Sequence, residues 1–92
     1  MNEELILLTD FISSTDAELE FIDLLEAEGL IQTIVREQVK YIHTEQLPDL
    51  ETFTRLYYDL SINIEGIDVI HNLLQRMREL EAELRLLRGR IM

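Results

Sequence analysis

The most restrictive feature of this sequence is the stretch from Asn63 to Gly89, which has no Pro and, after Gly66 in its first turn, no Gly until Gly89. Within it, apolar residues recur at alternating steps of three and four, which is the heptad pattern of a coiled coil. Asn63 can cap the start, so we expect a long helix that begins there. The pattern is carried by Ile70, Leu73, Met77, Leu80, Leu84, Leu87 and Ile91.

A chain of 92 residues is too small to bury the whole of this stripe in its own core. We expect the first part, with Ile67, Ile70 and Leu74, to pack back on the rest of the domain. From Met77 onward, few core residues remain to cover the stripe. We therefore predict a homodimer whose contact residues are Met77, Leu80, Leu84, Leu87 and Ile91.

The first thirty residues predict a short strand and two helices. Residues 5–8 form an apolar run that fits a strand, and Thr9 can cap a one-turn helix after it. Thr15 and Glu18 have the spacing of a capping box, so a second helix should begin there and end at Gly29. The apolar side of this second helix comprises Ala17, Phe21, Ile22, Leu24 and Leu25.

The next segment has the composition of strands. Residues 31–35 and 39–42 are rich in β-branched side chains, and residues 36–38 join them. Two such runs with a short connection predict a β-hairpin, or wing.

A third helix should follow the wing, with Thr44 as its cap and Pro48 near its start. Tyr57 and Tyr58 are adjacent on it and so point about 100° apart, which predicts that one is buried while the other reaches the surface. The buried stripe should comprise Leu47, Leu50, Phe53, Leu56, Tyr57 and Leu60.

Charge is unevenly placed along the chain. Residues 1–74 contain 3 basic and 16 acidic residues, whereas residues 75–92 contain 5 Arg and 3 Glu. Nucleic-acid affinity depends on Lys and Arg that neutralise phosphates, so we expect no nucleic-acid partner. A basic protein would be attracted to the acidic part, although acidity can also serve solubility alone.

Few side chains could carry catalysis or hold a metal. The chain has no Cys, and the two His, His43 and His71, lie far apart, so no usual zinc set can be assembled. The acids within residues 18–26 have no His, Ser or Cys beside them to act as catalytic partners. We expect no catalytic residue, no metal and no cofactor, and therefore no enzyme.

The N-terminus has neither the basic start nor the apolar length of a signal peptide or membrane span. We therefore expect a cytoplasmic protein without membrane contact.

The order of two helices, a wing, a helix and a long last helix resembles the MerR type of winged helix-turn-helix. In that family the second helix commonly carries two arginines and two aromatics and closes with Glu-x-x-Gly-Leu, and residues 18–30 are similar to it. Residues 60–67 resemble the family's turn into its next helix. The resemblance implies a mainly α fold, with a winged-helix core over residues 1–62 and a coiled-coil helix over residues 63–92, in one domain.

This chain departs from DNA-binding members of that family in charge. The two arginine positions that would meet DNA hold Glu20 and Asp23. In the wing, Lys40 is the only basic residue of its run, with Arg36 at the turn. The second helix is thus reversed in sign, although a MerR-like DNA-binding transcription regulator stays as the alternative, and a pure oligomerisation adaptor as a third possibility.

A subset of MerR-like proteins with this reversed character is the CbpM-type chaperone modulators. Residues 55–68, which read Arg-Leu-Tyr-Tyr-Asp-Leu-Ser-Ile-Asn-Ile-Glu-Gly-Ile-Asp, resemble the signature of that family closely. The resemblance implies a modulator that binds the J-domain of a DnaJ-like or CbpA-like co-chaperone and inhibits or tunes it. J-domains present a basic helix, which agrees with the acidity of this chain.

The residues that would meet such a partner can be placed on the second helix. Its acids lie on the face opposite Phe21 and Leu25, and an apolar residue, Leu19, falls among them. An apolar centre with a charged rim is typical of a protein interface. We therefore predict a partner-binding site formed by Leu19, Glu20, Asp23 and Glu26, extended by Glu65 and Asp68.

Overall fold

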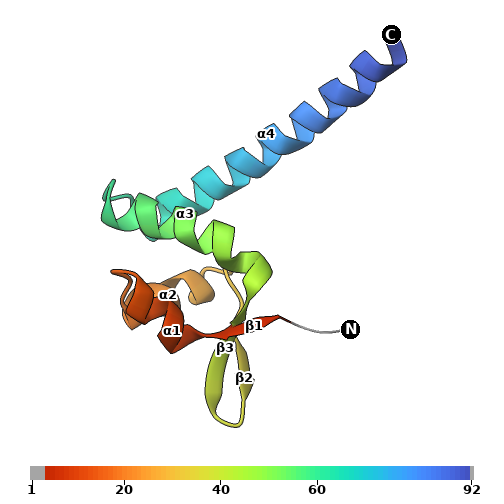
Figure 1. Ribbon diagram of the computed structural model, residues 1–92. Coiled ribbons are helices and arrows are strands. Elements are labelled where there is room, and N and C mark those ends of the chain that lie inside the picture. The colour runs from red at the N-terminus through yellow and green to blue at the C-terminus, as the bar shows by residue number, and fades with distance from the viewer. Residues whose placement is uncertain (1–3, 92) are drawn as a thin grey trace.

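The computed structural model describes residues 4–91, with the backbone alone of Ile91. This part of the chain is mainly helical, with a small wing and a long last helix, which confirms the predicted fold class (Figure 1). The elements are β1 (Leu5–Leu7), α1 (Leu8–Ser14), α2 (Leu19–Ala27), β2 (Ile34–Arg36), β3 (Val39–His43), the 3-10 turn η1 (Thr44–Gln46), α3 (Leu47–Tyr58) and α4 (Ile64–Ile91).

The predicted hairpin forms, although its first strand covers Ile34–Arg36 in place of residues 31–35, and a third strand joins it. Strands β2 and β3 pair antiparallel, with Ile34 opposite Tyr41, and β1 pairs with the other edge of β3, placing Ile6 opposite Ile42. The expected short N-terminal strand is therefore confirmed, with β3 as its partner. Strand β3 is bonded on both edges, and its Ile42 is fully buried because it packs in the core with residues of the helices.

The core lies where the sheet, α2, α3 and the start of α4 meet. Its most buried members come from every one of these elements, because each contributes one apolar face. They are Phe21, Ile22 and Leu25 from α2, Ile42 from β3, Leu50 and Phe53 from α3, and Ile67 from α4. The helix α1 adds Leu8 and Phe11.

The predicted caps Thr9 and Thr15 are wrong. Helix α1 continues directly from β1 at Leu8 and has no side-chain cap. The Thr15 hydroxyl donates to the Phe11 carbonyl at 3.2 Å and accepts from the Ala17 N–H at 3.2 Å, so it closes the turn after α1. Helix α2 begins later than expected, at Leu19, and Ala17 is buried in the turn before it.

Thr44 does not cap α3 either, because α3 begins only at Leu47, and the Thr44 hydroxyl donates to the Glu4 carboxylate at 3.3 Å. The segment after it forms η1, and Pro48 then stands in the first turn of α3 as predicted. Leu60 was expected in the buried stripe, but α3 ends at Tyr58 and Leu60 is exposed.

Two predicted helix ends are confirmed. Gly29 has φ +79°, and α2 closes through bonds from the Gly29 N–H to the Glu26 carbonyl at 3.0 Å and from the Leu30 N–H to the Leu25 carbonyl at 2.9 Å. At the start of α4, Asn63 Oδ1 accepts from the Gly66 N–H at 2.8 Å.

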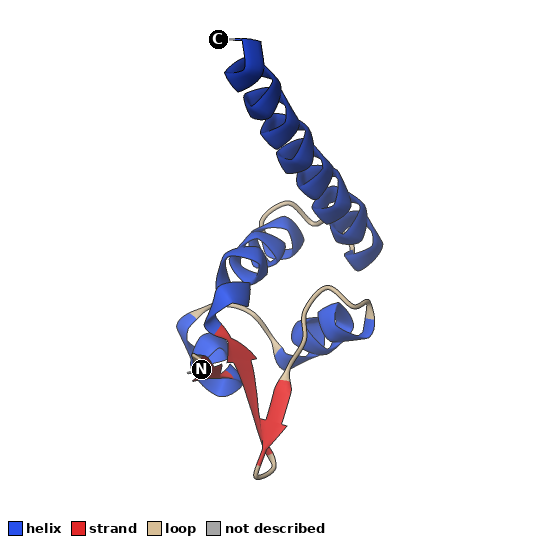
Figure 2. Cartoon of the chain, turned by 90° about the vertical axis from the view of Figure 1, so that its right-hand side faces the viewer, coloured by secondary structure: helices blue, strands red, loops and turns tan. Residues whose placement is uncertain are grey.

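Helix α4 begins against the core and then leaves it (Figure 2). Ile67 is buried and Ile70 and Leu74 are half-buried, as predicted. Beyond Leu74, every described side chain of α4 is exposed. Gly89 does not end the helix, which runs to Ile91.

The backbone conformation at the tip of the wing indicates where substitutions can raise stability. Arg36 and Val39 are paired, so Glu37 and Gln38 alone make the turn, with φ of 52° and 68°. Because side chains with a Cβ disfavour positive φ, Glu37→Asn with Gln38→Gly should raise the free energy of unfolding by about 1 kcal/mol. Urea denaturation followed by circular dichroism measures this change.

The control is Glu51→Gly on the exposed side of α3. There the added backbone freedom of glycine should lower the free energy of unfolding by about 1 kcal/mol, because the helix does not need a positive φ. A double variant at the turn no more stable than the parent chain would contradict the prediction.

Candidate functional site

The outer surface of α2 lies between the wing and the start of α4. Residues 18–28 include five acidic residues and no basic residue. Leu19, at 53% exposure, stands among exposed Glu20 and Asp23, so these three predicted site residues do face solvent together. This arrangement combines an exposed apolar side chain with exposed carboxylates, which is the chemistry that a cationic protein surface would complement.

Three aromatic rings set the orientation of α2. The Phe21 ring lies 4.5 Å from that of Tyr57 and 5.3 Å from that of Tyr58, and Tyr58 Oη accepts from the Glu18 N–H at 3.0 Å. The expectation that only one tyrosine would be buried is wrong. Both are half-buried, because both rings close over Phe21.

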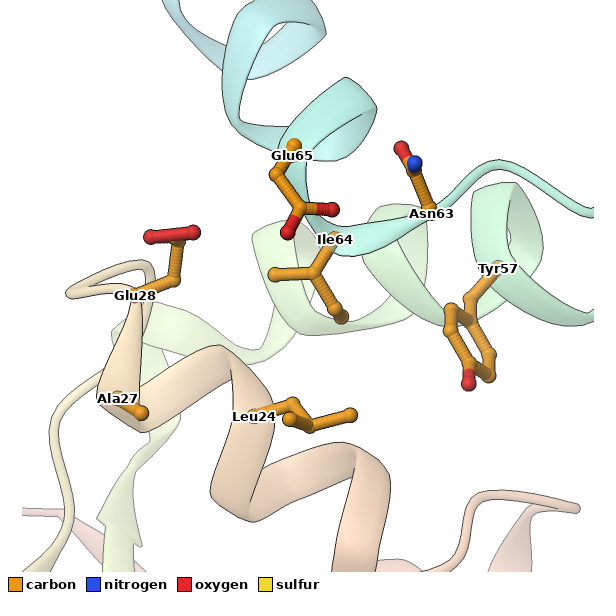
Figure 3. Close-up of a pocket in the computed structure, with 7 residues that line it drawn as sticks. All are labelled: Leu24, Ala27, Glu28, Tyr57, Asn63, Ile64 and Glu65. Atoms are coloured by element: carbon orange, nitrogen blue, oxygen red, sulfur yellow. The ribbon is translucent and has the colours of Figure 1, made fainter.

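On the side toward α4, the outer surface of α2 borders a groove of about 380 Å³ (Figure 3). Its lining residues come from α2, α3 and the first turn of α4. They are Leu24, Ala27, Glu28, Tyr57, Asn63, Ile64 and Glu65.

Leu24 was expected in the core, and this prediction is wrong, because it is 48% exposed. The buried face of α2 is centred on Phe21, Ile22 and Leu25, and a rotation of about 100° per residue turns Leu24 away from it. Sequence reasoning therefore missed both Leu24 and its neighbour one turn on, Glu28. A helical wheel centred on those three buried residues would have identified them.

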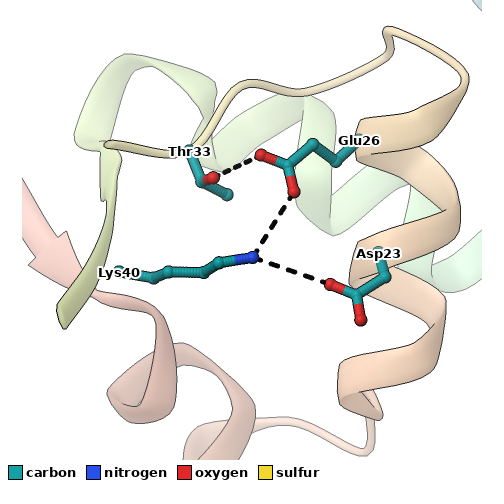
Figure 4. Close-up of polar contacts among 4 residues, drawn as sticks. All are labelled: Asp23, Glu26, Thr33 and Lys40. Atoms are coloured by element: carbon teal, nitrogen blue, oxygen red, sulfur yellow. Dashed lines mark hydrogen bonds and ion pairs between the residues drawn. The ribbon is translucent and has the colours of Figure 1, made fainter. Parts of the chain in front are cut away.

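On the side toward the wing, a basic residue pairs with two of the acids of α2 (Figure 4). Lys40 Nζ lies 3.6 Å from Glu26 Oε1 and 3.9 Å from Asp23 Oδ1. The Thr33 hydroxyl donates to the Glu26 carboxylate. This hydrogen bond is the main reason that the pKa of Glu26 is below its ordinary value. Lys40 lowers it further, while partial burial opposes both.

The two predicted site residues on α4 lie apart from each other. Glu65 is exposed and lines the groove opposite Glu28. Asp68 is half-buried, does not line the groove and accepts from Asn72 Nδ2 at 3.4 Å. The structure therefore brings Leu19, Glu20 and Asp23 together on one exposed face of α2. Glu26 is half-buried toward the wing, Glu65 lies at the groove, and Asp68 lies outside it.

The predicted dimer residues form an exposed apolar stripe on α4. Met77, Leu80, Leu84 and Leu87 are 44% to 54% exposed. The side chain of Ile91 lies outside the described residues.

Among the residues that the structure describes, no group of His, Cys, Asp and Glu is placed to hold a metal ion. In the same residues, no helix has the length and apolar character needed to cross a membrane.

The helices, the wing and the last helix together define a winged helix-turn-helix protein. The family model described as MerR HTH family regulatory protein matches residues 6–89, which is most of the chain. The chain therefore belongs to the MerR family of helix-turn-helix regulatory proteins. No curated protein and no solved structure matches it.

The Glu26 contacts predict a pH-dependent contribution to stability. A carboxyl whose pKa is lowered on folding stabilises the protein above its unfolded pKa, and that contribution is lost as the pH falls through the folded pKa. Thr33→Val should thus raise the pKa of Glu26 and lower the free energy of unfolding by about 1 kcal/mol at neutral pH, and by less in acid. Carbon-13 NMR titration of Glu26 and urea denaturation at both pH values measure these changes.

Thr52→Val is the matched control, since the Thr52 hydroxyl donates to the Pro48 carbonyl at 3.0 Å and to no carboxylate. Its effect should be the same at both pH values. An unshifted Glu26 titration in Thr33→Val would refute the assignment.

Proposed function

We propose that this MerR-family regulator is a chaperone modulator that binds the basic J-domain of a DnaJ-like or CbpA-like co-chaperone in the cytoplasm and inhibits or tunes it. The observation that carries the proposal is the outer surface of α2, where exposed Leu19 stands among exposed Glu20 and Asp23. The similarity of residues 55–68 to the CbpM signature supports it. The role is one of binding, without a catalytic step.

Charge favours a basic protein over DNA. Glu20 and Asp23 stand where DNA-binding relatives have arginines, and the resulting field repels phosphate. Lys40, the basic residue of strand β3, is directed at two carboxylates of α2. A duplex would therefore meet acids on α2 and a wing lysine that is already engaged, whereas a cationic helix would meet complementary charge.

The test is calorimetry of the full chain against the J-domain of the DnaJ-like co-chaperone from the same cell. Glu20→Arg with Asp23→Arg should weaken binding by about tenfold or more and remove most of its salt dependence. Leu19→Ala should raise the dissociation rate with little change in salt dependence, because it removes an apolar contact.

Glu45→Arg with Glu51→Arg is the matched control, since it changes the net charge equally at exposed positions of η1 and α3. Parental affinity in the α2 variant, with its fold intact by circular dichroism, would mean that the partner surface lies elsewhere. Salt-sensitive binding of duplex DNA by the parent chain, without J-domain binding, would favour the transcription regulator instead.

We propose further that the exposed stripe of α4 pairs with a second copy of the chain. Four large apolar side chains at heptad spacing are exposed along the tail, which is the arrangement that a coiled coil buries. A seam of about three heptads is short, so the dimer should be of moderate affinity.

Leu80→Glu tests the dimer, because it places a charge in the middle of the stripe. Sedimentation equilibrium should show the parent chain as a dimer at high micromolar concentration and Leu80→Glu as a monomer. Leu86→Glu is the control, since Leu86 is 66% exposed but lies off the heptad positions. A parent chain that is monomeric at that concentration, or an unchanged mass in Leu80→Glu, would refute the dimer.

A further inference from the structure

We propose that the groove between α2 and the first turn of α4 is the binding site for a cationic amphipathic helix of the partner. The inference rests on the proposed function and names the contact within it. The helix would place an apolar side chain against Leu24 and Ile64 and a basic side chain between Glu28 and Glu65.

The floor of the groove is apolar and accessible. Leu24 is 48% exposed there, and Ala27, Tyr57 and Ile64 surround it. Figure 3 shows the side chains of Leu24 and Ile64 directed into the same space from α2 and α4. A large apolar residue in a concave surface with a polar rim has the character of an interface centre.

The rim of the groove is acidic on both sides. Glu28 ends α2 and Glu65 stands in the first turn of α4, on opposite sides of the groove (Figure 3). Among residues 4–90, no side chain bonds to either carboxylate. The negative end of the α2 helix dipole lies at Glu28 and adds to the negative potential on that side of the groove. A cation placed between the two carboxylates would therefore be stabilised from both sides.

The start of α4 would otherwise attract an anion, but its free N–H groups are partly satisfied. One of these groups, the Gly66 N–H, donates to Asn63 Oδ1 at 2.8 Å. With the Glu28 and Glu65 carboxylates nearby, the start of α4 does not make a phosphate site. The complementary occupant is positively charged.

The spacing of the residues favours a helix as the occupant. Leu24 and Glu28 are four residues apart on α2, so an apolar and an acidic contact lie one turn apart. An amphipathic helix presents apolar and basic side chains at the same interval. The opposite edge of α2 lacks this match, because Lys40 already engages Asp23 and Glu26 there. The partner helix would therefore lie along the Leu24 edge of α2, next to the outer surface that carries Leu19.

The test uses the full chain, with two groove variants and two probes. The variants are Leu24→Ser and the pair Glu28→Gln with Glu65→Gln. The probes are the co-chaperone's J-domain and a synthetic amphipathic peptide with leucine and lysine four residues apart. Leu24→Ser should raise the Kd for both probes by about tenfold, and the double variant should raise it several-fold and reduce its salt dependence.

Matched controls change the same residue types elsewhere. Leu60→Ser removes an exposed leucine, and Glu45→Gln with Glu51→Gln removes two exposed carboxylates away from the groove. Both should stay within about twofold of the parent Kd. Circular dichroism confirms that each variant is folded.

The outcomes separate the inference from the proposed function. J-domain binding that both groove variants leave unchanged overturns the groove and keeps the chaperone role. If the parent chain does not bind the J-domain, the proposed function fails, and peptide binding alone then tests whether the groove binds a cationic helix. Peptide binding that Leu24→Ser weakens then supports the groove as the binding site of a cationic helix, and absence of peptide binding overturns the inference.

Discussion

The packing of Phe21 beneath Tyr57 and Tyr58 is the contact on which the rest of the surface depends. It fixes the rotation of α2 about its own axis, since Phe21 is 2% exposed and two rings of α3 enclose it. Once this rotation is set, Glu20 and Asp23 must face outward and Leu24 must face α4. The same Tyr57 ring then forms part of the groove, so one aromatic cluster serves both the core and the surface.

The acidic residues of α2 have different neighbours along the two edges of the helix. Toward the wing, Lys40 and Thr33 hold Asp23 and Glu26 in a polar network that links β3 to α2. Exposed ion pairs contribute little to stability, so the main effect of this network is to define the local charge. Toward α4, Glu28 has no such partner among the described residues, and negative potential is left at the groove.

The sequence predicted the elements that depend on local periodicity, and it failed where distant segments meet. The heptads of α4, the β-branched runs of the wing, the Gly29 stop and the Asn63 cap all depend on neighbours within a few residues. Thr44 resembled a cap, but its hydroxyl donates to Glu4, which is far away in the sequence. The pairing of Lys40 with Asp23 and Glu26 likewise requires β3 to lie beside α2, which no local pattern indicates.

Helix α4 is unbroken from Ile64 to Ile91, so it joins the groove to the tail as a single rod. Glu65 and Leu84 are 19 residues apart on it, which at a rise of 1.5 Å per residue separates them by about 28 Å. Ile64 and Ile67 anchor the start of this rod in the core, so a molecule bound to the exposed tail near Leu84 would be held at this distance from the groove.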